Sequence, residues 1–405
     1  MKPSTPKSQR SLAEGAVALS PAEAKRRAAA LVPKLIERAR TCEEIGRCPD
    51  ETIADLRESG LLRMMQPARF GGAELSAEPV LEVMLELCRG CPSTAWVFVN
   101  LVTHSWNIGQ FPLQAQEDVW AHDPDAVAAT GLAFPCGRAI PVEGGYRLTG
   151  RWPFASGVDA SSWMLVGAMV QRDGEPERRM FLIPQSDFRS LGNWRAYGLA
   201  GTGSHDVEIK DAFVPAHRTL AADVFASGIT PGAKVNPAPV FRLPPFASFP
   251  FFLAMVPLGT ARAAVEEFLA AARKRVATYS GARVADHVPV QMRLAEASAA
   301  VDLAELSLRT DLRALVSIIE SGGQPSLEDK IRWRRNLAFV AQLCVRAVDS
   351  LMAASGGGGI LLTNPMQARF RDVHAAAAHI SMTWDVQATL YGQNALGIAI
   401  EGLVI

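Results

Sequence analysis

The spacing of apolar residues changes twice along this chain, and these two changes limit its possible folds more than any other feature. The first part shows helical spacing, with Leu31 and Leu35 on one face of a predicted helix. The middle part alternates, as in HDVEIKDAFVP, and the pair Gly144-Gly145 between two alternating segments predicts a β-hairpin. Helical spacing then returns and predicts four long helices.

This order of patterns predicts a mostly α-helical protein with a small central β domain. A chain of 405 residues is too long for one compact core, so several domains are expected. We expect a disordered lead-in at residues 1–20, an N-terminal helical domain at 21–125, a β-barrel or β-sandwich at 126–235 and a C-terminal four-helix bundle at 236–405.

The charge balance excludes two classes of partner. Lys and Arg together number 41, as do Asp and Glu, so the formal net charge is zero. We therefore expect neither nucleic acid nor an anionic membrane as a partner. The densest apolar run, residues 245–259, is shorter than the roughly 18–20 residues that cross a bilayer. The first residues lack the apolar segment of a secretory signal, so a cytoplasmic location is expected.

Neither the cysteines nor any known nucleotide-binding motif predicts a functional site in this sequence. Six cysteines in a chain of this length do not form a disulfide framework. Cys88 and Cys91 have CxxC spacing, but no second pair or histidine partner follows, so no metal site is predicted. No Rossmann GxGxxG and no P-loop motif occurs in the sequence, so the chain carries no nicotinamide-binding fingerprint.

Five stretches occur in an order and spacing that identify a family. They are PARFGGAELS, GRWPFASGVDASSW, GLAGTGSHDVEIKDAFVPAHR, GTARAAVEEF and ASGGGGILLTNPMQARFRDVHAAAAH. Over nearly its whole length the chain resembles the acyl-CoA dehydrogenase superfamily. Within it, the chain is most similar to the two-component flavin-dependent monooxygenases, which include the oxygenase component of 4-hydroxyphenylacetate 3-hydroxylase. The resemblance implies an acyl-CoA dehydrogenase-like fold.

The resemblance also implies a reaction and its partners. Reduced flavin from a separate NAD(P)H:flavin reductase would react with O2 to give a C4a-hydroperoxide, which hydroxylates a phenol or another electron-rich aromatic molecule. A homotetramer, built through the C-terminal bundle, is expected. N- or S-oxygenation on the same scaffold, an acyl-CoA dehydrogenase-like reaction and a non-enzymatic relative remain alternatives. FMN and FAD (as FMNH2 or FADH2) are equally compatible, because the Phe-Gly that often follows an adenine-binding Arg is absent here.

One histidine, His379, stands out in RDVHAAAAHISMTWD, residues 371–385, a stretch that is predicted to be one helix. No Glu occurs between Glu328 and Glu401, so the catalytic carboxylate of one dehydrogenase subgroup is missing. His379 lies one residue short of that place. An imidazole with a pKa near 6.5 could accept a phenolic proton or donate one to the peroxide near neutral pH. The neighbouring alanines leave room for a flat ring.

Most of the remaining site residues are assigned by the resemblance. Ser156 matches the serine that contacts flavin N5 and stabilises the hydroperoxide, and Trp194 matches the aromatic residue beside the ring. His104 matches a histidine on the substrate side. Independently of the resemblance, the apolar helix ends with Trp106 and Phe111 are predicted to meet the substrate and suggest a flat, apolar molecule. Further residues are predicted to contact the flavin ring or its phosphate: Thr202, Gly203, Ser204, Arg273, Arg275, Gly357, Gly358, Asn364 and Arg371.

Overall fold

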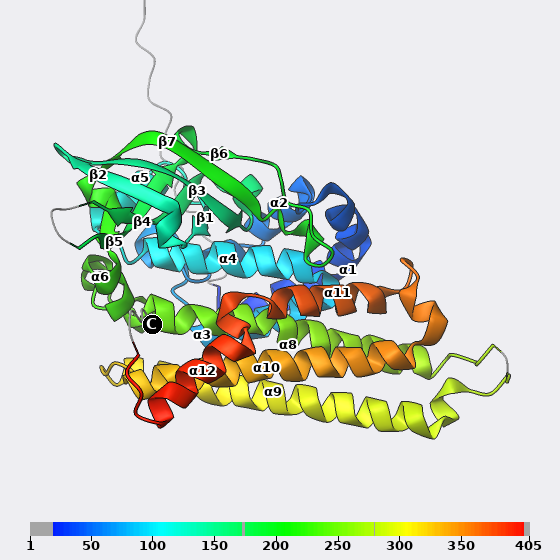
Figure 1. Ribbon diagram of the computed structural model, residues 1–405. Coiled ribbons are helices and arrows are strands. Elements are labelled where there is room, and N and C mark those ends of the chain that lie inside the picture. Colours follow the sequence, from blue (N-terminus) through cyan, green and yellow to red (C-terminus); the bar gives the residue numbers. More distant parts are fainter. Residues whose placement is uncertain (1–18, 172–174, 279, 401–405) are drawn as a thin grey trace, which may run out of the picture.

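The structure is a computed structural model that describes residues 19–171, 175–278 and 280–400. It has a β-sheet on one side and a set of long helices on the other, with helix α4 (Pro92–Ile108) between them (Figure 1). Most of the predicted disordered lead-in, residues 1–18, lies outside the described residues. The predicted domain boundaries stay predictions.

Helices make up the first part of the described chain. Besides α4 they are α1 (Pro21–Ile45), α2 (Asp50–Glu58), α3 (Ala77–Gly90) and α5 (Leu113–Trp120). The side chain of Ser20 begins α1 by accepting a hydrogen bond from the backbone N–H of Glu23. Every residue of α4 is buried, since α3, α8 and β1 pack around it. Side chains on α4 can therefore reach both the sheet and the helical bundle.

Eight strands form one mixed sheet in the order β6-β7-β3-β2-β4-β5-β8, and β1 pairs with β4. The strands are β1 (Ala128–Gly131), β2 (Gly137–Val142), β3 (Gly145–Ala155), β4 (Trp163–Val170), β5 (Glu177–Pro184), β6 (Arg189–Ser190), β7 (His205–Pro215) and β8 (Thr219–Ala221). Val142 pairs with Gly145 across the β2–β3 turn, which confirms the predicted hairpin. Gly144 has a φ of 76°, a value that favours glycine in such a turn.

The C-terminal part is helical again. Its helices are α6 (Ala222–Ser227), α7 (Pro231–Val235), α8 (Pro245–Ala272), α9 (Val288–Glu320), α10 (Leu327–Ala354), α11 (Pro365–Ala377) and α12 (Trp384–Ala395). Helix α8 packs against α3, α4, α9, α10 and α11, and it lies between α4 and the pair α9 and α10 (Figure 1). This position explains why α8 is almost entirely apolar.

Two helices, α8 and α10, are long and apolar enough to cross a membrane by length and composition alone. The sequence analysis did not foresee this, because it counted only uninterrupted apolar runs. In α8, 83% of the most apolar window is buried, as in the core helix of a soluble protein. In α10 the buried share is 44%, so this helix is only partly covered in a single chain.

The prediction of one helix through His379 is wrong. Helix α11 ends at Ala377, and His379 has extended backbone angles (φ −62°, ψ 138°). It precedes a short 3-10 helix, η11 (Ile380–Met382), and then α12. His374, by contrast, lies within α11, and its Nε2 lies 2.8 Å from Asp349 Oδ1.

Candidate active site

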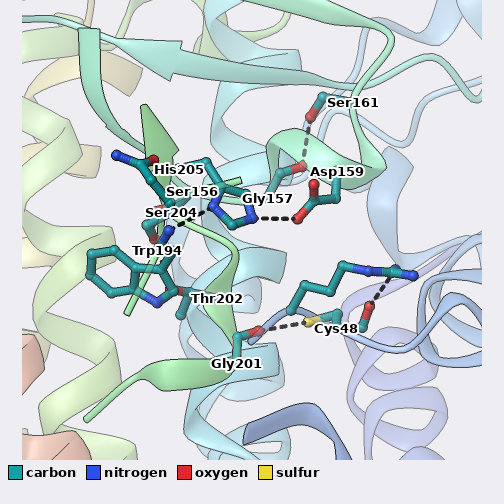
Figure 2. A network of polar contacts seen from close by, with 12 residues as sticks. Cys48, Ser156, Gly157, Asp159, Ser161, Trp194, Gly201, Thr202, Ser204 and His205 are labelled. Atoms are coloured by element: carbon teal, nitrogen blue, oxygen red, sulfur yellow. Dashed lines mark hydrogen bonds and ion pairs between the residues drawn. The ribbon is translucent and has the colours of Figure 1, made fainter. Parts of the chain in front are cut away.

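A chain of buried hydroxyl groups lies where the sheet meets α4 (Figure 2). Ser156, the first residue after β3, accepts a hydrogen bond from Trp96 Nε1 at 3.0 Å. Its Oγ lies 2.8 Å from Ser204 Oγ, which lies 2.7 Å from Thr202 Oγ1. Thr202 in turn donates to the Leu199 carbonyl at 2.9 Å. Three residues that the sequence predicted separately are thus joined in one hydrogen-bond chain, made of Trp96, Ser156, Ser204, Thr202 and Leu199.

Two aromatic side chains lie beside the hydrogen-bond chain. Trp194 Nε1 also donates to the Leu199 carbonyl, at 3.2 Å. The Trp194 ring meets the Phe154 ring edge-on, with centroids 6.2 Å apart. Phe154 is 69% exposed although it is a large apolar residue. An exposed aromatic face next to convergent hydroxyl groups is typical of a ligand site, and these residues fit a flat cofactor such as flavin.

Sequence reasoning missed Phe154. Strict alternation along β3 would put Phe154 on the same face as Trp152, which is fully buried in the sheet core. A register shift between Trp152 and Ala155 and a left-handed backbone at Phe154 (φ 62°) turn the ring outward. The only available signal was that an aromatic residue directly precedes the Ala-Ser of the WPFASG motif.

Gly203 shapes the loop instead of presenting a free amide. Its backbone N–H donates to the Gly46 carbonyl at 3.0 Å, so that group is already used. Its φ is 54°, and an added Cβ would lie 2.4 Å from Asp159 Oδ2. The same loop is held by His205, whose Nε2 lies 3.3 Å from Asp159 and whose Nδ1 accepts from the Trp194 N–H (Figure 2). A substitution of Gly203 would therefore displace its neighbours Thr202 and Ser204.

His379 lies across Trp96 from the hydroxyl groups, with ring centroids 5.9 Å apart. Its Nδ1 accepts a hydrogen bond from the Ser381 N–H at 3.2 Å, so the proton of the neutral ring is on Nε2. Burial lowers its pKa to about 4, not near 6.5 as the sequence analysis assumed. At neutral pH this imidazole is therefore uncharged, and its Nε2–H, which has no acceptor among the described residues, is a hydrogen-bond donor.

His104 has the opposite arrangement. Its Nδ1 lies 2.8 Å from the Ala128 carbonyl and must donate to it, which leaves Nε2 as an acceptor. That nitrogen faces the Thr130 hydroxyl at 3.1 Å. Burial lowers the pKa of His104 to about 4, so it is also neutral at pH 7. The half-buried ring of Phe249 stacks beside it at 6.1 Å. Sequence reasoning missed Thr130 and Phe249, which carry no motif.

The structure does not bring Trp106 and Phe111 to this site. Trp106 is fully buried and donates to the Val240 carbonyl at 2.8 Å. Phe111 is fully buried as well and packs against Phe225. Both side chains are part of the apolar packing around α4 and α5.

Some of the predicted phosphate-binding residues form a second group. Arg275, Gly358 and Asn364 line a cavity of about 410 Å³ between the ends of α8 and α10 and the start of α11. Asn364 donates to the Gly358 carbonyl at 3.0 Å and accepts from the Met366 N–H, so it also begins α11. Gly357 has open space around it. Arg273 is exposed and is not among the residues that line this cavity.

Arg371 belongs to neither group. It forms an ion pair with Glu43 and donates to the Tyr197 carbonyl at 2.6 Å. Its Nε donates to Gln367 at 2.9 Å. These contacts hold α11 against α1 and against the loop that precedes Leu199, which makes Arg371 a residue that supports the hydrogen-bond chain.

Comparison with known proteins agrees with this geometry. The acyl-CoA dehydrogenase N-terminal domain family matches residues 22–123, and the C-terminal domain family matches residues 251–384. The chain is 36% identical to the oxygenase component of FADH2-dependent resorcinol hydroxylase from Rhizobium sp. (strain MTP-10005), across 90% of this chain and 91% of that one. It is 33% identical to the oxygenase component of p-hydroxyphenylacetate 3-hydroxylase from Acinetobacter baumannii, across 91% of this chain and 87% of that one.

A solved structure shows the same fold. The crystal structure of 3-HSA hydroxylase from Rhodococcus sp. RHA1 matches with a TM-score of 0.90 and 32% identity, across 95% of this chain and 99% of that one. The chain therefore belongs to the acyl-CoA dehydrogenase superfamily. Within this superfamily, the chain belongs with the oxygenase components of flavin-dependent monooxygenases. The fold and family predicted from the sequence are confirmed.

Proposed function

We propose that this protein hydroxylates a small phenol or another electron-rich aromatic molecule, with reduced flavin and O2 as co-substrates. The observation that carries the proposal is the pair of neutral histidines whose Nε2 atoms have opposite hydrogen-bonding roles. Nε2 of His104 is an acceptor, which the Thr130 hydroxyl contacts at 3.1 Å, and Nε2 of His379 is a donor. Trp96, which contacts His379, and His104 are eight residues apart on α4, about 12 Å along the helix axis. A small aromatic ring fits within that length.

Bound reduced flavin supplies the oxygen-activating chemistry, and the protein residues bind, orient and move protons. In our proposal Ser156 meets flavin N5, while Phe154 and Trp194 lie beside the ring. His104 accepts a hydrogen bond from the phenolic hydroxyl and takes its proton as the ring is attacked, when the phenol becomes more acidic. Nε2–H of His379 donates a hydrogen bond to the oxygen that is transferred.

Two alternatives give different predictions. An acyl-CoA dehydrogenase needs a carboxylate to remove an α-proton, and the segment between Glu328 and Glu401 supplies no Glu. An N- or S-oxygenase needs no base for a phenolic proton, so the acceptor function of His104 would have no use. The substrate arrangement around His104 and Thr130 therefore favours hydroxylation of a phenol.

We also propose the partners and the assembly. The name "oxygenase component" carried by the relatives implies a separate reductase, and an NAD(P)H:flavin reductase fits a chain without a nicotinamide fingerprint. FADH2 is supported by the FADH2-dependent relative, with FMNH2 as the alternative. A homotetramer is supported by exposed apolar residues on one helix, namely Met292, Leu303 and Leu306 of α9. The fold is of a soluble type, and we place it in the cytoplasm.

The test mixes the protein with chemically reduced FAD without oxygen and then adds oxygen with a panel of phenols, indoles, thioethers and amines. We expect one hydroxylated product from a phenol, with little H2O2. Product formation from thioethers or amines alone would contradict phenol hydroxylation. Bleaching of bound oxidised FAD by an acyl-CoA in the absence of oxygen would instead support a dehydrogenase. Analytical ultracentrifugation tests the tetramer.

A further inference from the structure

The hydrogen-bond chain is fixed at both ends by groups that have only one possible role. At one end, Trp96 Nε1 can only donate, and it donates to Ser156 Oγ at 3.0 Å. At the other end, the Leu199 carbonyl can only accept, and Thr202 Oγ1 lies 2.9 Å from it. Thr202 and Ser204 are 1% and 5% exposed, so solvent does not offer them other partners.

These two ends determine the direction of every hydroxyl between them. Each hydroxyl has one hydrogen, and Thr202 uses its hydrogen on Leu199. The contact of 2.7 Å between Thr202 and Ser204 therefore requires Ser204 to donate. Ser204 then has no hydrogen left for Ser156, so in their contact of 2.8 Å Ser156 is the donor. Ser156 thus spends its only hydrogen on Ser204 and keeps one lone pair free.

We propose that this fixed direction makes Ser156 a hydrogen-bond acceptor toward flavin N5 and so makes the site select reduced over oxidised flavin. Reduced flavin carries a hydrogen on N5 and can donate it to Ser156, whereas N5 of oxidised flavin has only a lone pair and needs a donor. The inference rests on the proposed function, in which Ser156 meets N5. Thr202, Ser204 and Trp96 act in it as positioning residues.

The loop that carries the accepting end is itself held in place. Leu199 has a left-handed backbone (φ 49°), and its N–H donates to Asp372 Oδ1 of α11 at 2.7 Å. Its carbonyl accepts from both Trp194 and Thr202. Reversal of Ser156 to serve oxidised flavin would require Ser204 and Thr202 to turn as well, and Thr202 would lose its bond to Leu199. One such bond corresponds to about a fivefold to tenfold change in an equilibrium constant.

The test compares the dissociation constants of oxidised and reduced FAD, measured without oxygen, in four single variants and one double variant. Thr202→Val removes the hydroxyl that fixes the direction, and Ser204→Ala interrupts the chain. Ser156→Ala removes the group that meets N5. Thr103→Val is the matched control, because Thr103 is also a fully buried threonine whose hydroxyl donates to a backbone carbonyl, that of Val99, at 2.7 Å.

We expect the wild type and Thr103→Val to bind reduced FAD more tightly. In Thr202→Val and Ser204→Ala the preference should shrink by about fivefold to tenfold, because Ser156 becomes free to donate to oxidised N5. A tenfold change corresponds to a shift of about 30 mV in the two-electron potential of the bound flavin, which gives a second readout. In a Ser156→Ala background, Thr202→Val should change neither quantity.

Three results would overturn the inference. One is an unchanged preference in Thr202→Val and Ser204→Ala while both flavin forms still bind. Another is a wild type that prefers oxidised FAD. The third is an equal effect of Thr202→Val with and without Ser156. Failure of the wild type to bind either form, with FAD or FMN, would instead refute the proposed function, and this result is distinct from the other three.

Discussion

His104 and His379 are both neutral imidazoles with a pKa lowered to about 4 by burial, yet they offer opposite groups to a ligand. A strand carbonyl takes the Nδ1 hydrogen of His104, whereas a backbone N–H of a 3-10 helix occupies Nδ1 of His379. The backbone beside each ring therefore decides which histidine accepts and which donates. Residue type alone does not distinguish them.

The largest effect is expected when the acceptor role of His104 is removed. His104→Asn keeps a side-chain N–H that can reach the Ala128 carbonyl but removes the Nε2 acceptor. We expect kcat for hydroxylation of a phenol to fall by about 100-fold to 10,000-fold, because general-base assistance is lost. Flavin should still bind and should release more H2O2. An unchanged product yield would contradict the acceptor role.

A second prediction uses the stability of the protein against acid. The unfolded chain binds a proton on His104 near pH 6.5, whereas the folded protein does so only near pH 4. The free energy of unfolding should therefore fall as the pH drops through this window, by about 3 kcal/mol from His104. Urea unfolding of wild type and His104→Asn at pH 7.5, 5.5 and 4.5 measures the difference. If the free energy of unfolding fell equally with pH in the two proteins, His104 would not be buried as described.

The donor side is tested by His379→Asn. The Asn side-chain oxygen can still accept from the Ser381 N–H, so the start of η11 is kept while the Nε2–H is lost. We expect the ratio of hydroxylated product to H2O2 to fall by about tenfold, the effect of one hydrogen bond to a developing charge. Phenol binding should be unchanged. A lower affinity for the phenol with normal coupling would reverse the roles assigned to the two histidines.

The smallest expected effect concerns the exposed aromatic ring beside the hydrogen-bond chain, away from both histidines. Phe154→Ala should weaken the binding of oxidised and reduced FAD equally, by about threefold to tenfold, because an aromatic contact is lost. Phe213→Ala is the control, since Phe213 is an exposed aromatic residue of the same sheet, 43% exposed, on β7. Equal losses in both variants would mean that flavin does not lie against Phe154.

The sequence predicted the family and the hairpin because these depend on local patterns. It failed at His379, because four alanines favour a helix and no Gly or Pro marks its end. The helix stops through tertiary contacts instead: η11 packs on α10, and Gln387 donates to the Ile380 carbonyl at 2.9 Å. The prediction that Trp106 lies at the substrate site was wrong for a related reason. In a helix buried on all sides, periodicity does not show which face meets a cavity.

The protonation of the site was equally hidden from the sequence. The pKa values of both histidines follow from burial. The tautomer of His104 is set by a backbone partner far away in the sequence, the Ala128 carbonyl. The tautomer of His379 is set by the Ser381 N–H, which is in place because the helix ends at Ala377. Ser156, Thr202 and Ser204 were found as motif residues. Their shared hydrogen-bond direction depends on Trp96, which no motif marks.

The complete burial of α4 has a practical consequence for enzyme engineering. Because Trp96 and His104 project from one buried helix, the rise of that helix fixes their axial separation, and side-chain changes elsewhere will not lengthen it. Wider or bulkier aromatic compounds have to be accommodated sideways. The half-buried ring of Phe249, which stacks beside His104, is the position at which a library for altered substrate range should start.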